Sequence, residues 1–157
     1  MANDRVLLHS QPFLLIEFTR SRSRHSNDNA LAESKNASIV RKTFGYQHIE
    51  QKWAPLLNEF NRHYLNPYIN YHRPCFFPET ITDEKGKQRK KYLYEKMMTP
   101  YEKLKSLPES SSYLKPEITF EILDEYAIKI SDNESVEILN AERQRLFNLI
   151  FKETKTA

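Results

Sequence analysis

The sequence has 157 residues, 39% of them hydrophobic and 29% charged, with a formal net charge of +3. This length suits one hydrophobic core with an extension, and nineteen aromatic residues argue against a disordered linker. A single cysteine, Cys75, excludes an internal disulfide and a multi-cysteine zinc site. No segment has the roughly 20 apolar residues of a membrane span and no signal peptide is recognisable, so we expect a cytoplasmic protein.

The charge is unevenly distributed along the chain. Residues 19–42 carry six Lys or Arg against two acidic residues, and residues 83–105 carry eight against four, so each zone has a net charge of +4. Residues 109–157 hold ten acidic and six basic residues, for a net charge of −4. This distribution is compatible with a polyanionic partner for the first two thirds of the chain.

The first 74 residues predict one strand and two helical regions. Residues 12–19 are mostly apolar and predict a buried strand, which leads into a polar, basic loop over residues 21–29. A helix is expected from Ala30 to about Arg41, capped by Asn27 or Asp28 and stopped by Gly45.

A second helix is expected to begin near Trp53, with Pro55 in its first turn. Asn66-Pro67 should kink or end it, with one further turn open over residues 68–71. Its predicted core face carries apolar residues at helical spacing: Ile49, Trp53, Leu56, Leu57, Phe60 and Tyr64.

The remainder predicts a hairpin and three helices. Residues 76–94 form two extended runs around residues 83–86, where Gly86 can take the positive φ of a tight turn. Thr99 to Glu102 has capping-box spacing with proline at the first helical position, so a short helix through Leu107 is expected. Apolar spacing predicts a helix over residues 120–130, and a second capping box at residues 131–134 precedes another helix over 136–151.

The most informative stretch is E-F-T-R-S-R at residues 17–22 followed by N-D-N-A-L-A-E-S-K-N at residues 27–36. It resembles the end of the catalytic core of DDE-type integrases and insertion-sequence transposases, with a motif like N-D-x-A-x-x-E-x-x-N. The resemblance continues through V-R-K-T-F-G-Y at 40–46, Y-H-R-P at 71–74 and T-P-Y-E-K-L at 99–104. It covers roughly the first two thirds of the chain, and the ordered series makes coincidence improbable.

The resemblance implies a ribonuclease H-like catalytic core that performs two-metal phosphodiester transfer during DNA integration and transposition. In that chemistry, carboxylates hold divalent ions that activate a water or a DNA 3′-hydroxyl and stabilise the leaving oxygen. Such hard ions, Mg²⁺ or Mn²⁺, require oxygen ligands. Glu33 matches the last acidic residue of the family and is the one candidate for both the catalytic and the metal-ligand role.

The sequence departs from the family upstream of Glu33. The family's second aspartate lies roughly 35 residues before the glutamate in the two-metal arrangement, a position that falls before Met1. Asp4 has neither the spacing nor the sequence context, so the role is not carried onto it. We therefore expect a truncated core with one remaining core strand, whose edges another segment or chain must cover. Whether the chain is an enzyme stays open; we expect it to be inactive alone and to hold no metal stably by itself.

The predicted fold class is α+β and mostly helical, with a truncated ribonuclease H-like core, a small β-hairpin and C-terminal helices. The expected regions are 1–74 for the core, 75–107 for a basic hairpin and short helix, and 108–157 for a helical extension. DNA is the expected partner, with self-association or a full-length transposase as further possibilities and no membrane. The predicted DNA contacts are Arg20, Arg22, Arg24, Lys35, Asn36, Arg41 and Lys42.

Alternatives stay open at this point. The arginine loop can be a solubilising surface, and the hairpin residues Lys87, Arg89, Lys90 and Lys91 are as compatible with protection of an edge strand as with DNA contact. The alternative functions are a non-catalytic DNA-binding or interaction remnant and the product of a decayed gene. The histidines His25, His63 and His72 lack metal-ligand spacing and are treated as structural.

Overall fold

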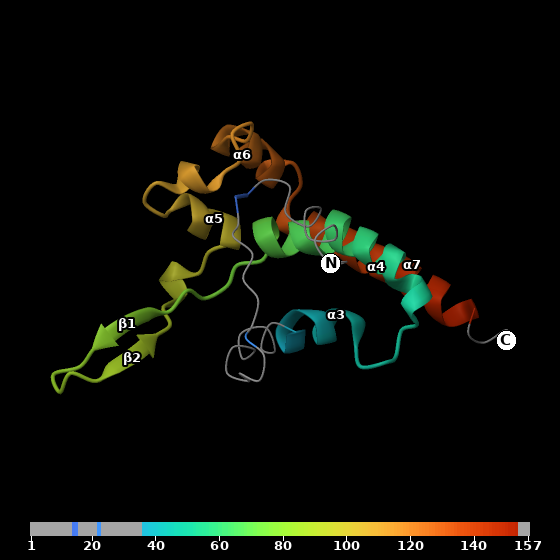
Figure 1. The fold of residues 1–157 in the computed structure, drawn as a ribbon, viewed down its shortest axis with the longest axis horizontal. Coiled ribbons are helices and arrows are strands. Elements are labelled where there is room, and N and C mark those ends of the chain that lie inside the picture. The colour runs from blue at the N-terminus through green and yellow to red at the C-terminus, as the bar shows by residue number, and fades with distance from the viewer. Residues whose placement is uncertain (1–13, 16–21, 23–35, 154–157) are drawn as a thin grey trace. The chain divides into compact units, whose positions relative to one another are not determined.

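The computed structural model describes residues 14–15, 22 and 36–153. Across these residues the chain is mostly helical and adds one two-stranded antiparallel sheet, which confirms the predicted α+β class (Figure 1). The chain divides into two compact units, one of residues 16–54 and one of residues 1–15 with 55–157. The predicted strand at 12–19 lies outside the described residues except for Leu14 and Leu15.

The smaller unit has three described helical segments. A π-helical turn at Asn36–Val40 runs into the short helix α3 (Arg41–Phe44), and a 3₁₀ turn follows at Gln51–Trp53. Gly45 ends α3 as predicted: its φ is 77° and its N–H donates to the carbonyl of Arg41 at 2.9 Å. The predicted start of this helix at Ala30, and its caps Asn27 and Asp28, lie outside the described residues.

A long helical stretch leads into the larger unit. It comprises α4 (Ala54–Phe60) and two π-helical turns, Asn61–Leu65 and Tyr68–His72. Pro67 has no N–H and its ring needs room beside the preceding turn, so it disrupts regular α-helical hydrogen bonding there, although its own φ of −55° and ψ of −49° are α-helical. The wider turn, in which the N–H of Asn66 donates to the carbonyl of Asn61, provides that room. The chain therefore continues as a helix past Pro67, one of the two outcomes that the sequence left open.

The wide turn also changes which residues are buried. Phe60 is 4% exposed and Leu65 is 6% exposed, whereas Tyr64 is only half-buried. The spacing from Phe60 to Leu65 is that of a π-turn, so the extra residue moves the buried stripe one position along the chain. The predicted burial of Leu56 is wrong, because its side chain is 41% exposed.

The helix α7 (Asp132–Glu153) packs against the two π-helical turns (Figure 1). At its start, Asp132 Oδ1 lies 3.0 Å from Nδ1 of the buried His72, at the end of the other stretch, so the two run antiparallel. Ser131 Oγ accepts from the N–H of Glu134, as the predicted capping box requires. The buried residues Leu139, Leu146 and Ile150 recur at helical spacing and form its core face.

Two shorter helices complete the core of the larger unit. They are α5 (Pro100–Lys105) and α6 (Phe120–Ile128), with 3₁₀ turns at Tyr94–Lys96 and Ser110–Tyr113. Tyr101, Leu114 and Leu123 form a buried cluster against which Leu14 packs. Leu14 also forms an antiparallel bridge with Leu114, and the N–H of Leu15 donates to the Tyr113 carbonyl at 2.8 Å. A distant segment of the same chain thus pairs with the described part of the predicted strand, although Leu15 is 55% exposed rather than buried.

Replacing Thr99 with alanine is expected to lower the free energy of unfolding by about 1 kcal/mol. The buried Thr99 hydroxyl accepts from the N–H of Glu102 at 3.2 Å, and the Glu102 carboxylate accepts from the N–H of Thr99 at 2.6 Å. Alanine removes the first of these bonds at the start of α5. Chemical denaturation measures the loss, with Thr80→Ala on an exposed strand as control. Equal losses in the two variants would contradict the capping role.

Candidate nucleic-acid interface

The predicted catalytic residue and several predicted DNA contacts are not among the described residues. Glu33, Arg20, Arg24 and Lys35 lie outside them, and Asn36 begins the π-helical turn that precedes α3. Arg22 is exposed. The structure therefore leaves the proposed role of Glu33 as a prediction from the sequence.

Two predicted DNA contacts, Arg41 and Lys42, are placed next to each other on α3. Both side chains are exposed, and neither has an acidic partner within the described ranges. The Arg41 guanidinium lies 5.6 Å from the ring centroid of Tyr46, which is 85% exposed. This contact orients the guanidinium while leaving its donors open to solvent, an arrangement that suits a phosphate ligand.

A second concentration of cations lies on the hairpin. Strands β1 (Glu79–Thr82) and β2 (Gln88–Lys91) pair antiparallel, with Glu79 opposite Lys91 and Thr82 opposite Gln88. All eight strand residues are exposed. Since side chains alternate between the faces of a strand, Arg89 and Lys91 share one face and Lys90 occupies the other. The predicted basic ribbon is confirmed as a structure, with Gly86 at a φ of 76° in its turn.

The acidic side chains of the hairpin are mostly engaged locally. Asp83 Oδ1 accepts from the N–H groups of Lys85 at 3.1 Å and Lys87 at 2.9 Å, and Asp83 Oδ2 lies 3.7 Å from Arg89 Nε. The Glu79 carboxylate accepts from Lys96 Nζ, and this hydrogen bond holds the pKa of Glu79 below its ordinary value. Two carboxylates therefore stabilise the turn and the base of the hairpin, and Glu79 also interacts electrostatically with Lys91, which lies opposite it.

Aromatic packing anchors the hairpin at its base. The ring of Phe76 makes edge contacts with Tyr92, at a centroid distance of 6.0 Å, and with Tyr94, at 5.1 Å. Cys75 and Met98 form an antiparallel bridge, and the Lys103 ammonium lies 5.7 Å from the ring centroid of Phe77. These contacts connect both ends of the hairpin to the start of α5.

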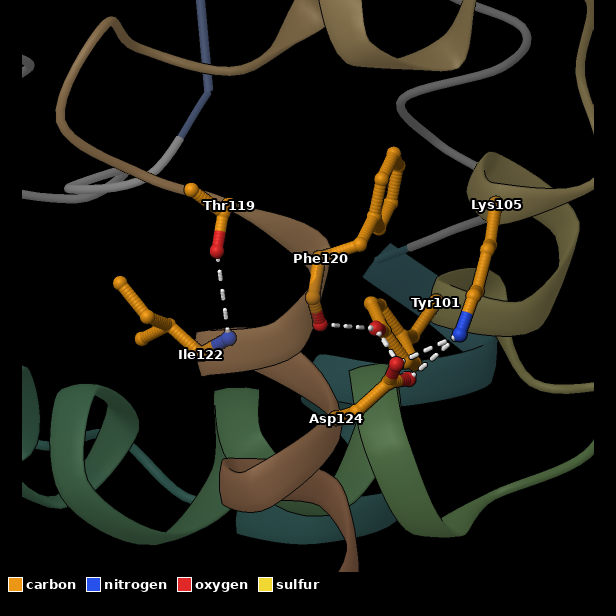
Figure 2. Close-up of polar contacts among 6 residues, drawn as sticks. All are labelled: Tyr101, Lys105, Thr119, Phe120, Ile122 and Asp124. Atoms are coloured by element: carbon orange, nitrogen blue, oxygen red, sulfur yellow. Dashed lines mark hydrogen bonds and ion pairs between the residues drawn. The ribbon is translucent and has the colours of Figure 1, made fainter.

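A polar network then ties α5 to α6 (Figure 2). The Tyr101 hydroxyl donates to Asp124 Oδ1 at 2.7 Å, and Lys105 Nζ donates to the same carboxylate at 2.7 and 2.6 Å. Two hydrogen bonds lower the pKa of Asp124, and the one from Lys105 has a larger effect than the one from Tyr101. The pKa of Tyr101 is raised mainly by burial, and the hydrogen bond to Asp124 raises it further. Burial, with a smaller effect of Tyr126, raises the pKa of Tyr71 to about 12, so these hydroxyls stay neutral at physiological pH.

Sequence reasoning missed the Tyr101–Asp124–Lys105 network and the bond between His72 and Asp132. The partners are 19 to 23 residues apart in the network and 60 residues apart in the histidine pair, so no local motif identifies them. His72 is buried and bonded, and His63 Nε2 lies 3.0 Å from Glu59 on the same helical stretch. Those two histidines have structural contacts, while His25 lies outside the described residues.

No family model matches the sequence, and comparisons with curated proteins and with solved structures also found no match. Within the part of the chain that the structure describes, no three His, Cys, Asp or Glu side chains are grouped so that they could hold a metal ion. Over the same residues, no helix has the length and apolar character needed to cross a membrane.

Proposed function

We propose that the chain belongs to a DDE-type DNA integrase or transposase, in which it binds DNA and supplies Glu33 as a metal ligand. Residues 1–74 are proposed to be part of a ribonuclease H-like core. The observation that carries the proposal is the ordered motif series from residue 17 to residue 104, in which Asn27, Asp28, Ala30, Glu33 and Asn36 match the segment with the last acidic residue.

The described residues support the DNA-binding part of the proposal. Directly after the motif, α3 presents Arg41 and Lys42 to solvent, and the guanidinium of Arg41 is held beside Tyr46. Binding of exposed, unpaired cations to a polyanion releases the counterions of that polyanion, and this release makes binding favourable. Arginine and lysine contacts to phosphate position a protein on DNA without reading its sequence, so we propose backbone contacts for these residues.

Glu33 is proposed to act as one oxygen ligand of Mg²⁺ or Mn²⁺. When two such ions are bound, they supply Lewis acidity for the attack on the phosphodiester and for departure of the leaving oxygen. One carboxylate cannot hold two ions in this geometry, so the chain alone is proposed to bind DNA without transferring strands. A non-catalytic DNA-binding protein is the second candidate, because the exposed cations of α3 and of the hairpin serve this function without Glu33.

Binding and chemistry are separated by comparing the native chain with Glu33→Gln. Both proteins are expected to bind a labelled DNA duplex equally in metal-free buffer, and neither is expected to transfer strands with Mn²⁺. Failure of the native chain to bind duplex DNA at low ionic strength would refute the proposal. Strand transfer that Glu33→Gln abolishes would show that Glu33 is a catalytic ligand and that the chain is active alone. Strand transfer that survives this substitution would remove Glu33 from the mechanism.

A further inference from the structure

The β1–β2 hairpin is an unusually open element of the larger unit. It has only two strands, all eight strand residues are exposed, and in Figure 1 it extends away from the helices that follow it. A two-stranded hairpin by itself is marginally stable in water. Here the Asp83 turn and the packing of Phe76 on Tyr92 and Tyr94 hold it in shape. The exposed part is therefore a defined surface rather than part of the core.

Most lysines of this surface have no ion-pair partner among the described residues. Arg89 has Asp83 as its ion-pair partner, and Lys96 has Glu79. Across the described residues, no ion pair engages the four remaining lysines of the hairpin, although Lys91 lies opposite Glu79 in the strand register. Among the described acidic side chains of the hairpin, Glu84 is exposed and has no ion pair, whereas Glu79 and Asp83 each have one. These four lysines are Lys85, Lys87, Lys90 and Lys91.

Protection of edge strands explains only part of this pattern. A two-stranded ribbon has two open edges, one on each strand, and lysines discourage further pairing at an edge. Here the strand cations Arg89, Lys90 and Lys91 are all on β2, whereas β1 has the sequence E-T-I-T and carries no lysine or arginine. The open edge of β1 is thus left without positive charge. A negatively charged partner of β2 explains why the cations lie on one strand only, whereas edge protection does not explain it.

The geometry points to duplex DNA as this partner: we propose that the β1–β2 hairpin is a second DNA-contacting element, with β2 against the phosphate backbone. The inference rests on the proposed function and adds a surface to it. A two-stranded ribbon fits the major groove of B-form DNA, which is about 12 Å wide. Alternate residues on a strand lie about 7 Å apart, so Arg89 and Lys91 on one face can reach different phosphates of one groove wall, and Lys90 on the opposite face can reach the other wall. The deep, narrow major groove of duplex RNA does not admit the ribbon.

The test compares the double variant Lys90→Ala/Lys91→Ala with Lys115→Ala/Lys129→Ala in the full chain. Each pair removes two positive charges, and the control pair lies near α6, outside the hairpin. Anisotropy of a labelled DNA duplex is measured over a salt series. If both hairpin lysines contact phosphates, their loss should make the slope of log affinity against log salt shallower by about 1.8. The loss of affinity between about 50 and 200 mM salt is then about tenfold smaller than in the native chain. The control pair should keep the native slope.

The variant Lys90→Arg/Lys91→Arg preserves both positive charges and should therefore keep the native slope, and unchanged helicity of the alanine variant excludes misfolding as the cause of its smaller slope. Hairpin and control variants that behave alike would overturn the inference, as would a hairpin effect confined to duplex RNA. Failure of the native chain to bind DNA is the distinct outcome that refutes the proposed function itself. If DNA binding depends on Arg20, Arg22 and Arg24 but is indifferent to the hairpin, the proposed function stands and the hairpin inference fails.

Discussion

Affinity of the chain for duplex DNA is expected to fall about 10³-fold when the salt concentration rises from about 50 to about 200 mM. The expectation follows from six cations that flank Glu33 in the sequence, because each phosphate contact adds about 0.9 to the slope of log affinity against log salt. Six contacts give a slope of roughly −5. These six are Arg20, Arg22, Arg24, Lys35, Arg41 and Lys42. Fluorescence anisotropy over a salt series measures the slope directly.

The arginine loop is tested by replacing Arg20, Arg22 and Arg24 together with alanine. Loss of three phosphate contacts should lower the slope by about 2.7 and weaken binding most strongly at low salt. The control replaces three cations of the acidic C-terminal region and should leave the slope near its native value. These are Lys115, Lys129 and Arg145, the last already paired with Glu142.

The outcomes distinguish the candidate functions. Binding that does not respond to salt would contradict phosphate contacts altogether. If the slope is steep and the arginine variant leaves it unchanged, other cations contact the DNA, including those of the hairpin. A slope that falls in the arginine variant alone would place the main DNA surface beside Glu33, where the integrase proposal requires it.

The elements that the sequence predicted well are those fixed by contacts within a few residues. The Thr99 capping box forms as expected, because its two hydrogen bonds connect residues three positions apart. Gly45 and Gly86 take positive φ values at the helix end and in the turn, where a residue without a side chain is least strained. Predicted boundaries moved slightly: α5 ends at Lys105 rather than Leu107, and α7 begins at Asp132, ahead of the predicted start at residue 136.

Other features depend on which distant segments meet, and the sequence does not encode these meetings in a local pattern. The bridge between Leu14 and Leu114 and the bond between His72 and Asp132 join segments that no motif connects. The same limitation affects the charge count. The sequence has eight cations in residues 83–105. In the structure, however, Lys96 pairs with Glu79 and Lys105 pairs with Asp124. The sequence located the basic zone, and only the structure distinguishes its free lysines from its paired ones.

Replacing Leu123 with alanine is expected to destabilise the larger unit by about 3 kcal/mol, within the range of about 2–5 kcal/mol for buried leucine. Leu123 is 2% exposed and packs with Tyr101 and Leu114. The loss combines the transfer free energy of the removed carbons with the cavity that the neighbouring rings cannot fill. Denaturant unfolding measures it, and Ile122→Ala, at a 48% exposed position of the same helix, is the matched control.

The size of this loss reveals whether the segments around Leu123 unfold as one unit. The cluster joins α5 and α6 with Leu14, so its collapse should release the anchoring of the hairpin at the start of α5 along with the helices. A loss of about 3 kcal/mol is a large part of the roughly 5–15 kcal/mol that stabilises an ordinary domain. The hairpin's contribution to DNA binding by Leu123→Ala should therefore follow the unfolding curve and decline at the denaturant concentration where helicity is lost. Equal stability of the Leu123 and Ile122 variants would contradict the packing. A hairpin contribution to DNA binding that outlasts helicity would contradict the dependence of the hairpin on this core.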